Sequence, residues 1–193
     1  MNERVRVVGV ETLSEDWAVL RKTTFDWRRT DGSWRREARE TYDRGDGATI
    51  LLHDPEAGTV LLIRQFRLPA FVNGHADGML IEAPAGLLDS DDAEAAIRRE
   101  AEEETGVRVR EVRRLFDAYM SPGSVTERIA FFAATYRHAD RVSAGGGLVH
   151  DGEDIEVLEL PLAEALAMVG TGEIADGKTI MLLQWAQLAG LSR

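Results

Sequence analysis

Cysteine is absent from the sequence, lysine occurs only twice, and no apolar run is long enough to cross a bilayer. Without cysteine, the chain can form neither disulfide bonds nor thiolate metal sites. The longest apolar runs, at 48–52, 59–63 and 129–134, are far shorter than the ~20 residues of a membrane span. The first residues, MNERVRVV, lack the apolar core of a signal peptide. We therefore expect a cytoplasmic protein without a membrane partner.

Positive charge is also scarce, because 23 basic residues face 34 acidic ones and the formal net charge is −11. A protein that binds the nucleic-acid backbone is normally basic, so nucleic acid is not an expected partner. A small phosphorylated ligand remains compatible with this charge, because a divalent cation can bridge carboxylates to phosphates. The length of 193 residues and the 44% apolar content suit one domain, or one domain with an appendage.

Turn signals and the alternation of polar and apolar residues divide the chain into short elements. Residues 1–43 alternate around Asp31-Gly32, a dipeptide typical of β-hairpins, and a boundary loop follows at 43–47. Further strands are predicted at 48–54, 59–68, 80–86, 112–119, 126–137 and 155–160, and helices at 91–105, 161–170 and 178–191. This mixed order favours the α+β class over a doubly wound parallel sheet.

The helix predicted at 91–105 has an unusual distribution of charge. Asp91 is placed to cap it, and Glu94 completes a pattern similar to a capping box. At ~100° per residue, the apolar residues form a single stripe along the helix. The stripe consists of Ala93, Ala96, Ile97 and Ala101. Glu100 and Glu104 fall inside this stripe, whereas Glu102 lies on the opposite, solvent-facing side.

Two carboxylates on an inward face require an explanation. A buried, unpaired carboxylate is costly or becomes protonated, and two of them one helical turn apart repel each other. A hard divalent cation such as Mg²⁺ removes both problems and still accepts phosphate oxygens. The tight turn at 83–89 brings the carbonyl oxygen of Ala85 into consideration as a further ligand. The alternative is a partly buried helix with internal salt bridges, for which Arg99 and Glu103 have the right spacing.

The segment Gly86–Val107, GLLDSDDAEAAIRREAEEETGV, resembles the Nudix box. That pattern is a glycine, five residues, a glutamate, seven residues, Arg-Glu, an apolar residue, any residue, Glu-Glu, any residue, a glycine and an apolar residue. The matching residues are Arg99, Glu100, Ala101, Glu103, Glu104, Gly106 and Val107. The interval from Gly86 to Arg99 is one residue short, and Asp91 or Asp92 replaces the first glutamate.

Most of the chain resembles one branch of the Nudix family, the GDP-mannose pyrophosphatases, with the ADP-ribose pyrophosphatases as the next most similar group. The similar segments are RETYDRGDGATILL, LIRQFRLPAFVNG, LFDAYMSPGSVTE, AGGG, EDIEVLELP and GEIADGKTIMLLQ. The resemblance implies a Nudix α/β/α sandwich with a mixed sheet over residues 44–193. It also implies an N-terminal antiparallel β-sheet over residues 1–43, exchanged between the subunits of a homodimer with shared active sites. The implied reaction is Mg²⁺-dependent hydrolysis of the nucleotide-sugar GDP-mannose to GMP and mannose 1-phosphate, with Mn²⁺ as a possible substitute.

The resemblance also assigns roles to individual residues. The implied metal ligands are Ala85, Glu100, Glu104 and Glu153, and the implied catalytic residues are Glu153, Glu103 and Arg99. Arg99 is expected to orient Glu103, and the alternative for Arg99 is a plain salt bridge within the helix. Glu153 lies in a glycine-rich loop that is expected to close on the site, and Asp151 and Asp154 compete with it for the role.

The substrate-binding residues implied by the resemblance extend over the whole chain. They are Trp17, Arg39, Glu40, Arg67, Ala85, Gly86, Leu87, Glu104, Glu127, Gly152, Glu153 and Lys178. Trp17 is a possible stacking platform for the guanine, and simple packing within the N-terminal strands is the alternative. By residue type alone, Arg39 and Glu40 would be solvent-facing strand residues. Two further hypotheses for the whole protein are an ADP-ribose pyrophosphatase and a catalytically silent nucleotide-sugar-binding protein.

Overall fold

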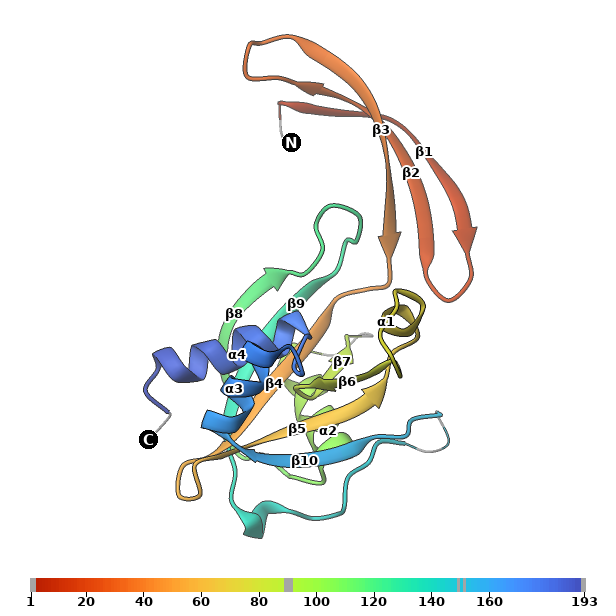
Figure 1. The fold of residues 1–193 in the computed structure, drawn as a ribbon. Coiled ribbons are helices and arrows are strands. Elements are labelled where there is room, and N and C mark those ends of the chain that lie inside the picture. Colours follow the sequence, from red (N-terminus) through yellow and green to blue (C-terminus); the bar gives the residue numbers. More distant parts are fainter. Residues whose placement is uncertain (1–2, 89–91, 149, 151, 192–193) are drawn as a thin grey trace. The chain divides into compact units, whose positions relative to one another are not determined.

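The structure is a computed structural model that describes residues 3–88, 92–148, 150 and 152–191. The chain forms two compact units (Figure 1). The smaller unit comprises residues 1–46 and 119–128, and the larger unit comprises residues 47–118 and 129–193. None of the helices in the described ranges has the length and apolar character that a bilayer crossing requires.

The smaller unit is built on a three-stranded antiparallel sheet in the order β1-β2-β3. The strands are β1 (Val5–Glu15), β2 (Val19–Arg28) and β3 (Trp34–Asp43). The predicted hairpin turn at Asp31-Gly32 is confirmed. The carboxylate of Asp31 accepts a hydrogen bond from the backbone N–H of Ser33 at 2.9 Å, and Gly32 has a positive φ of 85°. Every residue of β1 is exposed to solvent, so this edge strand lacks a covering layer.

A seven-stranded mixed sheet forms the centre of the larger unit. Five strands follow the order β10-β5-β4-β9-β8, while β6 pairs with β5 and β7 pairs with β4. The bounds are β4 Gly47–Asp54, β5 Thr59–Phe66, β6 Met79–Glu82, β7 Ala85–Leu87, β8 Arg113–Tyr119, β9 Arg128–Thr135 and β10 Glu156–Pro161. The pairing of β4 with β9 is parallel, whereas β4 pairs antiparallel with β5 and β7. The sheet is therefore mixed, as the resemblance implied.

Helices cover both faces of this sheet, which gives the expected α/β/α layers (Figure 1). The helices are α1 (Leu68–Val72), α2 (Ala93–Thr105), α3 (Leu162–Thr171) and α4 (Gly177–Leu188), with a short 3₁₀ turn at His138–Asp140. Helix α2 packs on β4, β5 and β7, while α4 packs on β4, β6 and α3.

The side-chain alternation of β4 explains how one strand supports both layers. Every residue of β4 is buried. Ala48, Ile50 and Leu52, at alternate positions, belong to one apolar cluster with Ile97 and Ala101 of α2. The cluster therefore fixes which side of α2 faces the sheet.

Three predicted boundaries need correction. The strand predicted at 59–68 ends at Phe66, because Pro69 favours the first turn of the short helix α1. The strand predicted at 80–86 divides into β6 and β7, because Pro84 has no N–H for a sheet hydrogen bond. Helix α2 begins at Ala93 with Asp92 as its N-cap, whereas the predicted cap Asp91 lies outside the described residues.

Candidate active site

Helix α2 turns two glutamates toward the sheet, which confirms the prediction from helical spacing. Its N-cap Asp92 accepts a hydrogen bond from the N–H of Glu94, and Gly106 ends the helix with a φ of 75°. Glu104 is only 3% exposed, and the side chain of Glu100 is 18% exposed. The two acids are one turn apart on the face that also buries Ile97 and Ala101.

Burial makes the charge on both acids unfavourable. It raises the pKa of the Glu104 carboxyl well above its ordinary value, against the lowering effect of a hydrogen bond from the N–H of Ala85 at 3.1 Å. Burial likewise raises the pKa of Glu100, and the negative charge of Glu103 adds to this effect while Arg99 opposes it. The free protein therefore maintains two carboxyl groups in a place that favours their neutral form.

Gly86 provides the room for Glu100. It lies in β7, where it pairs with Ala48 of β4. A Cβ added at Gly86 would overlap the carboxyl group of Glu100. Any side chain at this position would displace the carboxyl group, so the glycine and the glutamate form one structural unit.

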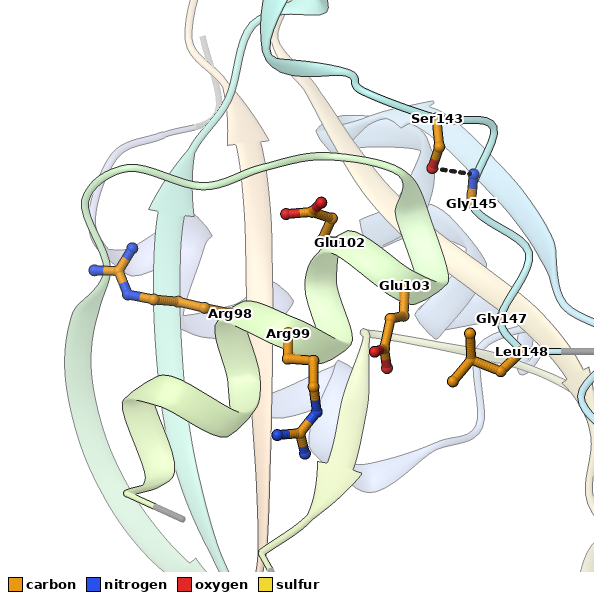
Figure 2. A pocket seen from close by; sticks show the side chains of 8 residues that line it. All are labelled: Arg98, Arg99, Glu102, Glu103, Ser143, Gly145, Gly147 and Leu148. Carbon is orange, nitrogen blue, oxygen red and sulfur yellow. Dashed lines mark hydrogen bonds between the residues drawn. The ribbon is translucent and has the colours of Figure 1, made fainter. Parts of the chain in front are cut away.

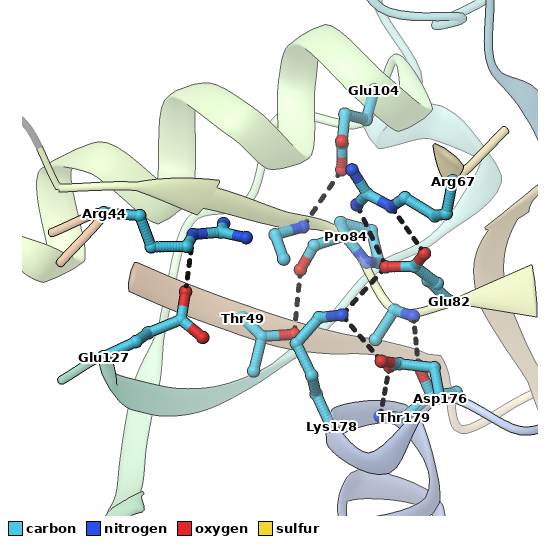
Figure 3. A network of polar contacts seen from close by, with 12 residues as sticks. Arg44, Thr49, Arg67, Glu82, Pro84, Glu104, Glu127, Asp176, Lys178 and Thr179 are labelled. Carbon is cyan, nitrogen blue, oxygen red and sulfur yellow. Dashed lines mark hydrogen bonds and ion pairs between the residues drawn. The ribbon is translucent and has the colours of Figure 1, made fainter. Parts of the chain in front are cut away.

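The segment from Glu82 to Gly86 is hydrogen-bonded to three neighbouring elements (Figure 3). The N–H of Ala83 donates to Thr179 Oγ1 at 2.7 Å, and the carbonyl oxygen of Pro84 accepts from Thr49 Oγ1 at 3.0 Å. The N–H of Ala85 donates to Glu104, as described above. These bonds join the segment to β4, α2 and α4, and they hold the backbone of Ala85 against Glu104.

Two cations converge on a buried carboxylate beside this segment (Figure 3). Arg67 forms a two-pronged ion pair with Glu82, through Nε at 2.7 Å and Nη2 at 3.0 Å. Lys178 Nζ donates to Glu82 and to Asp176, each at 2.8 Å. Although burial raises the pKa of Glu82, Arg67 and Lys178 keep that pKa below its usual value, so Glu82 is an anion. Figure 3 shows the Arg67 guanidinium next to the Glu104 carboxyl group, and an ionised Glu104 helps to raise the pKa of Arg67.

The glycine-rich loop reaches the C-terminal end of α2. The N–H of Gly146 donates to the carbonyl of Glu104 at 2.9 Å, and the N–H of Gly147 donates to the carbonyl of Glu103 at 3.1 Å. Beyond this contact, Glu153 Oε2 accepts a hydrogen bond from the N–H of Leu148 at 2.7 Å. The charge of Glu153 contributes to the raised pKa values of Glu100 and Glu104, so the loop brings a third acid toward them. Among the competing acids, Asp154 is exposed and Asp151 lies outside the described residues.

An open groove of about 560 Å³ lies between α2 and this loop (Figure 2). Its lining residues are Arg98, Arg99, Glu102, Glu103, Ser143, Gly145, Gly147 and Leu148. Arg99 Nη2 lies 3.6 Å from Glu100 Oε1, so Arg99 contacts a carboxylate of the inward pair. Glu102 faces outward and forms an ion pair with Arg108 at 2.7 Å. Glu103 is half-buried at the edge between the groove and Glu100.

The inward acids suit a hard divalent cation. Their donors are carboxylate oxygens, and a cation would relieve the penalty of burying both charges. Within the described ranges, three or more acidic or histidine side chains are nowhere gathered into one tight cluster. The third acid, Glu153, is instead bonded to Leu148. The acids already close to each other on one face are therefore the pair on α2, next to the backbone N–H of Ala85 that Glu104 binds.

The remaining predicted site residues have separate environments. Leu87 ends β7 and pairs with Gly47, and Gly152 is exposed with a φ of 80°. In the smaller unit, Trp17 is 71% exposed beneath the guanidinium of Arg44, which also pairs with Glu127 at 3.1 Å.

Arg39 and Glu40 are exposed on β3, where Arg39 forms an ion pair with Glu37. The roles of Trp17, Glu127, Arg39 and Glu40 toward a substrate stay predictions.

The sequence reasoning overlooked Glu82, Asp176 and Thr179. Asp176 caps α4 by accepting hydrogen bonds from the N–H and the hydroxyl of Thr179. One signal for Glu82 was present: it is an acid directly after the apolar strand residues MLI and before Ala83. A charge in that position indicates a buried partner.

Comparison with known proteins places these features in a family. Residues 4–42 match the model of the GDP-mannose pyrophosphatase NudK N-terminal domain, and residues 43–183 match the NUDIX domain. A GDP-mannose pyrophosphatase of Klebsiella pneumoniae is 55% identical over 191 residues, which cover 99% of this chain and 96% of the relative. Its counterpart in Pectobacterium atrosepticum is 56% identical over 190 residues, with 98% and 97% covered. The crystal structure of an ADP compounds hydrolase covers 98% of this chain and 97% of its own, with a TM-score of 0.71. At 17% identity, this last likeness concerns the fold alone.

Proposed function

The chain belongs to the Nudix family, and we propose that it is a GDP-mannose pyrophosphatase that hydrolyses GDP-mannose to GMP and mannose 1-phosphate. The matched relatives carry that name and align over nearly the whole chain. The structural observation that carries the proposal is the inward pair Glu100 and Glu104, held against Ala85 and Gly86. Such a pair serves a reaction in which phosphate charge must be neutralised.

Nudix hydrolases require a divalent metal, and we propose Mg²⁺, with Mn²⁺ as a substitute. Glu100, Glu104, Glu153 and the carbonyl of Ala85 would hold it. When bound, the cation supplies positive charge to the diphosphate oxygens and lowers the pKa of a coordinated water. Glu153 Oε2 accepts the hydrogen bond from Leu148, and the other carboxylate oxygen of Glu153 would bind the cation.

In this proposal, side chains of the site bind the substrate and accept a proton from the attacking water. Arg67 and Lys178 share Glu82 as a partner, three residues before the Ala85 N–H that binds Glu104, and they supply the fixed positive charges that attract the diphosphate. Glu103 is positioned at the edge of the groove to accept a proton from the attacking water, and Arg99 orients the carboxylates around it. Hydrolysis breaks one phosphoanhydride P–O bond and adds the elements of water across it.

We propose that the active form is a homodimer in which the N-terminal sheet of one copy completes the site of the other. The fully exposed strand β1, with Val7 63% and Val10 58% exposed, supports this proposal because an apolar edge strand needs a partner. Trp17, Arg39, Glu40 and Glu127 would then contact the substrate bound by the partner subunit. The location of the protein in the cytoplasm stays a prediction.

A hydrolysis panel tests the proposed function. Purified protein with Mg²⁺ is assayed on GDP-mannose, other GDP-sugars, ADP-ribose and ADP-glucose, and the products are identified. We expect GDP-mannose to be the preferred substrate and to yield GMP and mannose 1-phosphate. A preference for ADP-ribose, or binding without turnover of any substrate, would overturn the proposal.

A further inference from the structure

The ion pairs of Glu82 with Arg67 and Lys178 have a geometry that suggests a function in addition to stabilising the fold. Glu82 is 1% exposed, whereas the side chain of its partner Arg67 is 40% exposed. The anion thus lies in the protein interior, and the arginine above it extends toward the acids of α2. Lys178, whose side chain is 14% exposed, approaches the same carboxylate from the first turn of α4.

The two cations come from distant parts of the sequence, and Glu82 is their common partner. Arg67 is the N-cap residue of α1 and Lys178 is the second residue of α4. Among the described residues, Glu82 forms the only hydrogen bonds of the Arg67 guanidinium, through Nε and Nη2. The Nη1 amino group of Arg67 and one of the three Nζ protons of Lys178 are left to offer to an anion.

We propose that Glu82 is a positioning residue, which fixes the Arg67 guanidinium and the Lys178 ammonium in the orientation that receives the diphosphate of the substrate. This inference rests on the proposed function, because it assigns the diphosphate to these cations. Arginine and lysine side chains are long and flexible, so an unpaired cation would have to be ordered during substrate binding. The two-pronged pair fixes the guanidinium plane beforehand and leaves one edge of it for phosphate oxygens.

The position of Glu82 next to the metal-holding segment strengthens this interpretation. Its neighbour Ala83 is bonded to Thr179, and Ala85 is bonded to Glu104. Within five residues, the chain therefore fixes the cations that meet the diphosphate and the backbone that adjoins the inward acids. A salt bridge that served stability alone would need no such coupling.

The test measures substrate and anion binding in Glu82→Gln, which retains the shape of the side chain and removes its charge. We expect the KM for GDP-mannose to rise at least tenfold while kcat changes less than threefold. Inorganic pyrophosphate is the second probe. Calorimetry should give Glu82→Gln a dissociation constant for pyrophosphate that is at least tenfold larger than that of the wild type. The matched control is Asp117→Asn, which removes a two-pronged pair with Arg114 on β8, away from the described site. It should leave both constants within twofold.

A double variant separates positioning from plain structural damage. Because Glu82 acts in part through Arg67, the loss of pyrophosphate affinity in Arg67→Met/Glu82→Gln should be clearly smaller than the sum of the two single losses. Fully additive losses, or unchanged pyrophosphate binding in Glu82→Gln, would overturn the inference. If Glu82→Gln does not fold, the charge-balanced Glu82→Gln/Lys178→Met replaces it, with Lys178→Met as its reference. The double variant should retain the fold and bind pyrophosphate at least threefold more weakly than Lys178→Met, because Arg67 has then lost its partner, and equal affinity would overturn the inference. A wild type that binds pyrophosphate but does not hydrolyse GDP-mannose would refute the proposed function alone, and the pyrophosphate comparison would still decide the role of Glu82.

Discussion

The carboxyl group of Glu100 occupies the space that a Cβ atom would take at Gly86. This contact joins strand β7 to the acidic helix α2. The φ of Gly86 is not in the left-handed region that favours glycine, so the position calls for glycine because of the space that Glu100 occupies.

Gly86→Ala should reduce the hydrolysis of GDP-mannose at least 100-fold while the protein still folds. The added methyl group displaces the flexible end of the Glu100 side chain, so we expect a stability loss of only about 1–3 kcal/mol. Steady-state kinetics and urea unfolding measure the two effects. Gly170→Ala is the control, because a Cβ at Gly170 in α3 meets no atom within 4 Å. It should leave activity unchanged, and equal activity in Gly86→Ala would contradict the role of the contact.

Glu104→Gln should abolish turnover and yet leave the metal-free protein at least as stable as the wild type at neutral pH. The folded-state pKa of Glu104 is raised above the unfolded value of 4.5, so its contribution to stability is present below that value. This contribution is lost as the pH rises through the folded-state pKa of Glu104. Glutamine does not ionise, so the variant has no corresponding loss of stability. Thermal unfolding with a chelator, between about pH 4.5 and 8, should show that the variant loses less stability than the wild type. A variant that is clearly less stable throughout would contradict the assignment of a strained, buried acid.

The burial of His53 predicts a second dependence of stability on pH, with a sign opposite to that of Glu104. The side chain is 5% exposed, and its Nε2 has no hydrogen-bond partner among the described residues. Burial lowers the pKa of His53 below the unfolded value of 6.5, so the unfolded chain binds more protons as the pH falls below 6.5. Stability should therefore fall on acidification, by at most about 1.4 kcal/mol per pH unit for this one proton.

Urea unfolding of His53→Leu between about pH 7.5 and 5.5 measures that contribution. The variant should lose less stability than the wild type across this interval. His138→Leu, measured in parallel, is the control for the removal of an exposed histidine. An unchanged slope in His53→Leu would show that the histidine does not titrate as its burial requires.

Mixed dimers test whether active sites are shared between subunits. Arg39→Ala and Glu104→Gln should each be inactive as homodimers. If the N-terminal sheet of one copy serves the partner, a dimer of the two variants carries one site with both defects and one site with none. Random exchange should then restore about a quarter of the wild-type activity, because half of the dimers are mixed and each has one intact site. The absence of any recovery, despite mixed dimers seen by mass spectrometry, would contradict the sharing of sites.

The sequence was sufficient for the parts of the fold that depend on short-range periodicity. The spacing of Ala96, Ile97 and Ala101 predicted which side of α2 is buried, and Asp31-Gly32 predicted the hairpin turn. The same helical spacing predicted that Glu104 faces the interior, and its burial confirms this. These features are readable because each depends on residues within a few positions of one another.

Features that depend on contacts between distant parts of the chain could not be predicted from short-range periodicity. Glu82 meets Lys178 across 96 residues, and Thr179 meets Ala83 across a similar interval. No local pattern predicts such pairs, although an acid beside apolar strand residues signals that one exists. The overlooked helix α1 had a different cause, because its sequence LPAFV continues the apolar character of β5. Only Pro69 marks the change of structure there.

Calorimetric titration of Mg²⁺ into the wild type, Glu104→Gln and Glu102→Gln is the most direct measurement of whether the inward acids hold a divalent cation. The wild type and Glu102→Gln should bind Mg²⁺ with the same affinity, since Glu102 faces outward and pairs with Arg108. Glu104→Gln should bind it at least tenfold more weakly. Equal Mg²⁺ affinity in Glu104→Gln and the wild type would contradict the account.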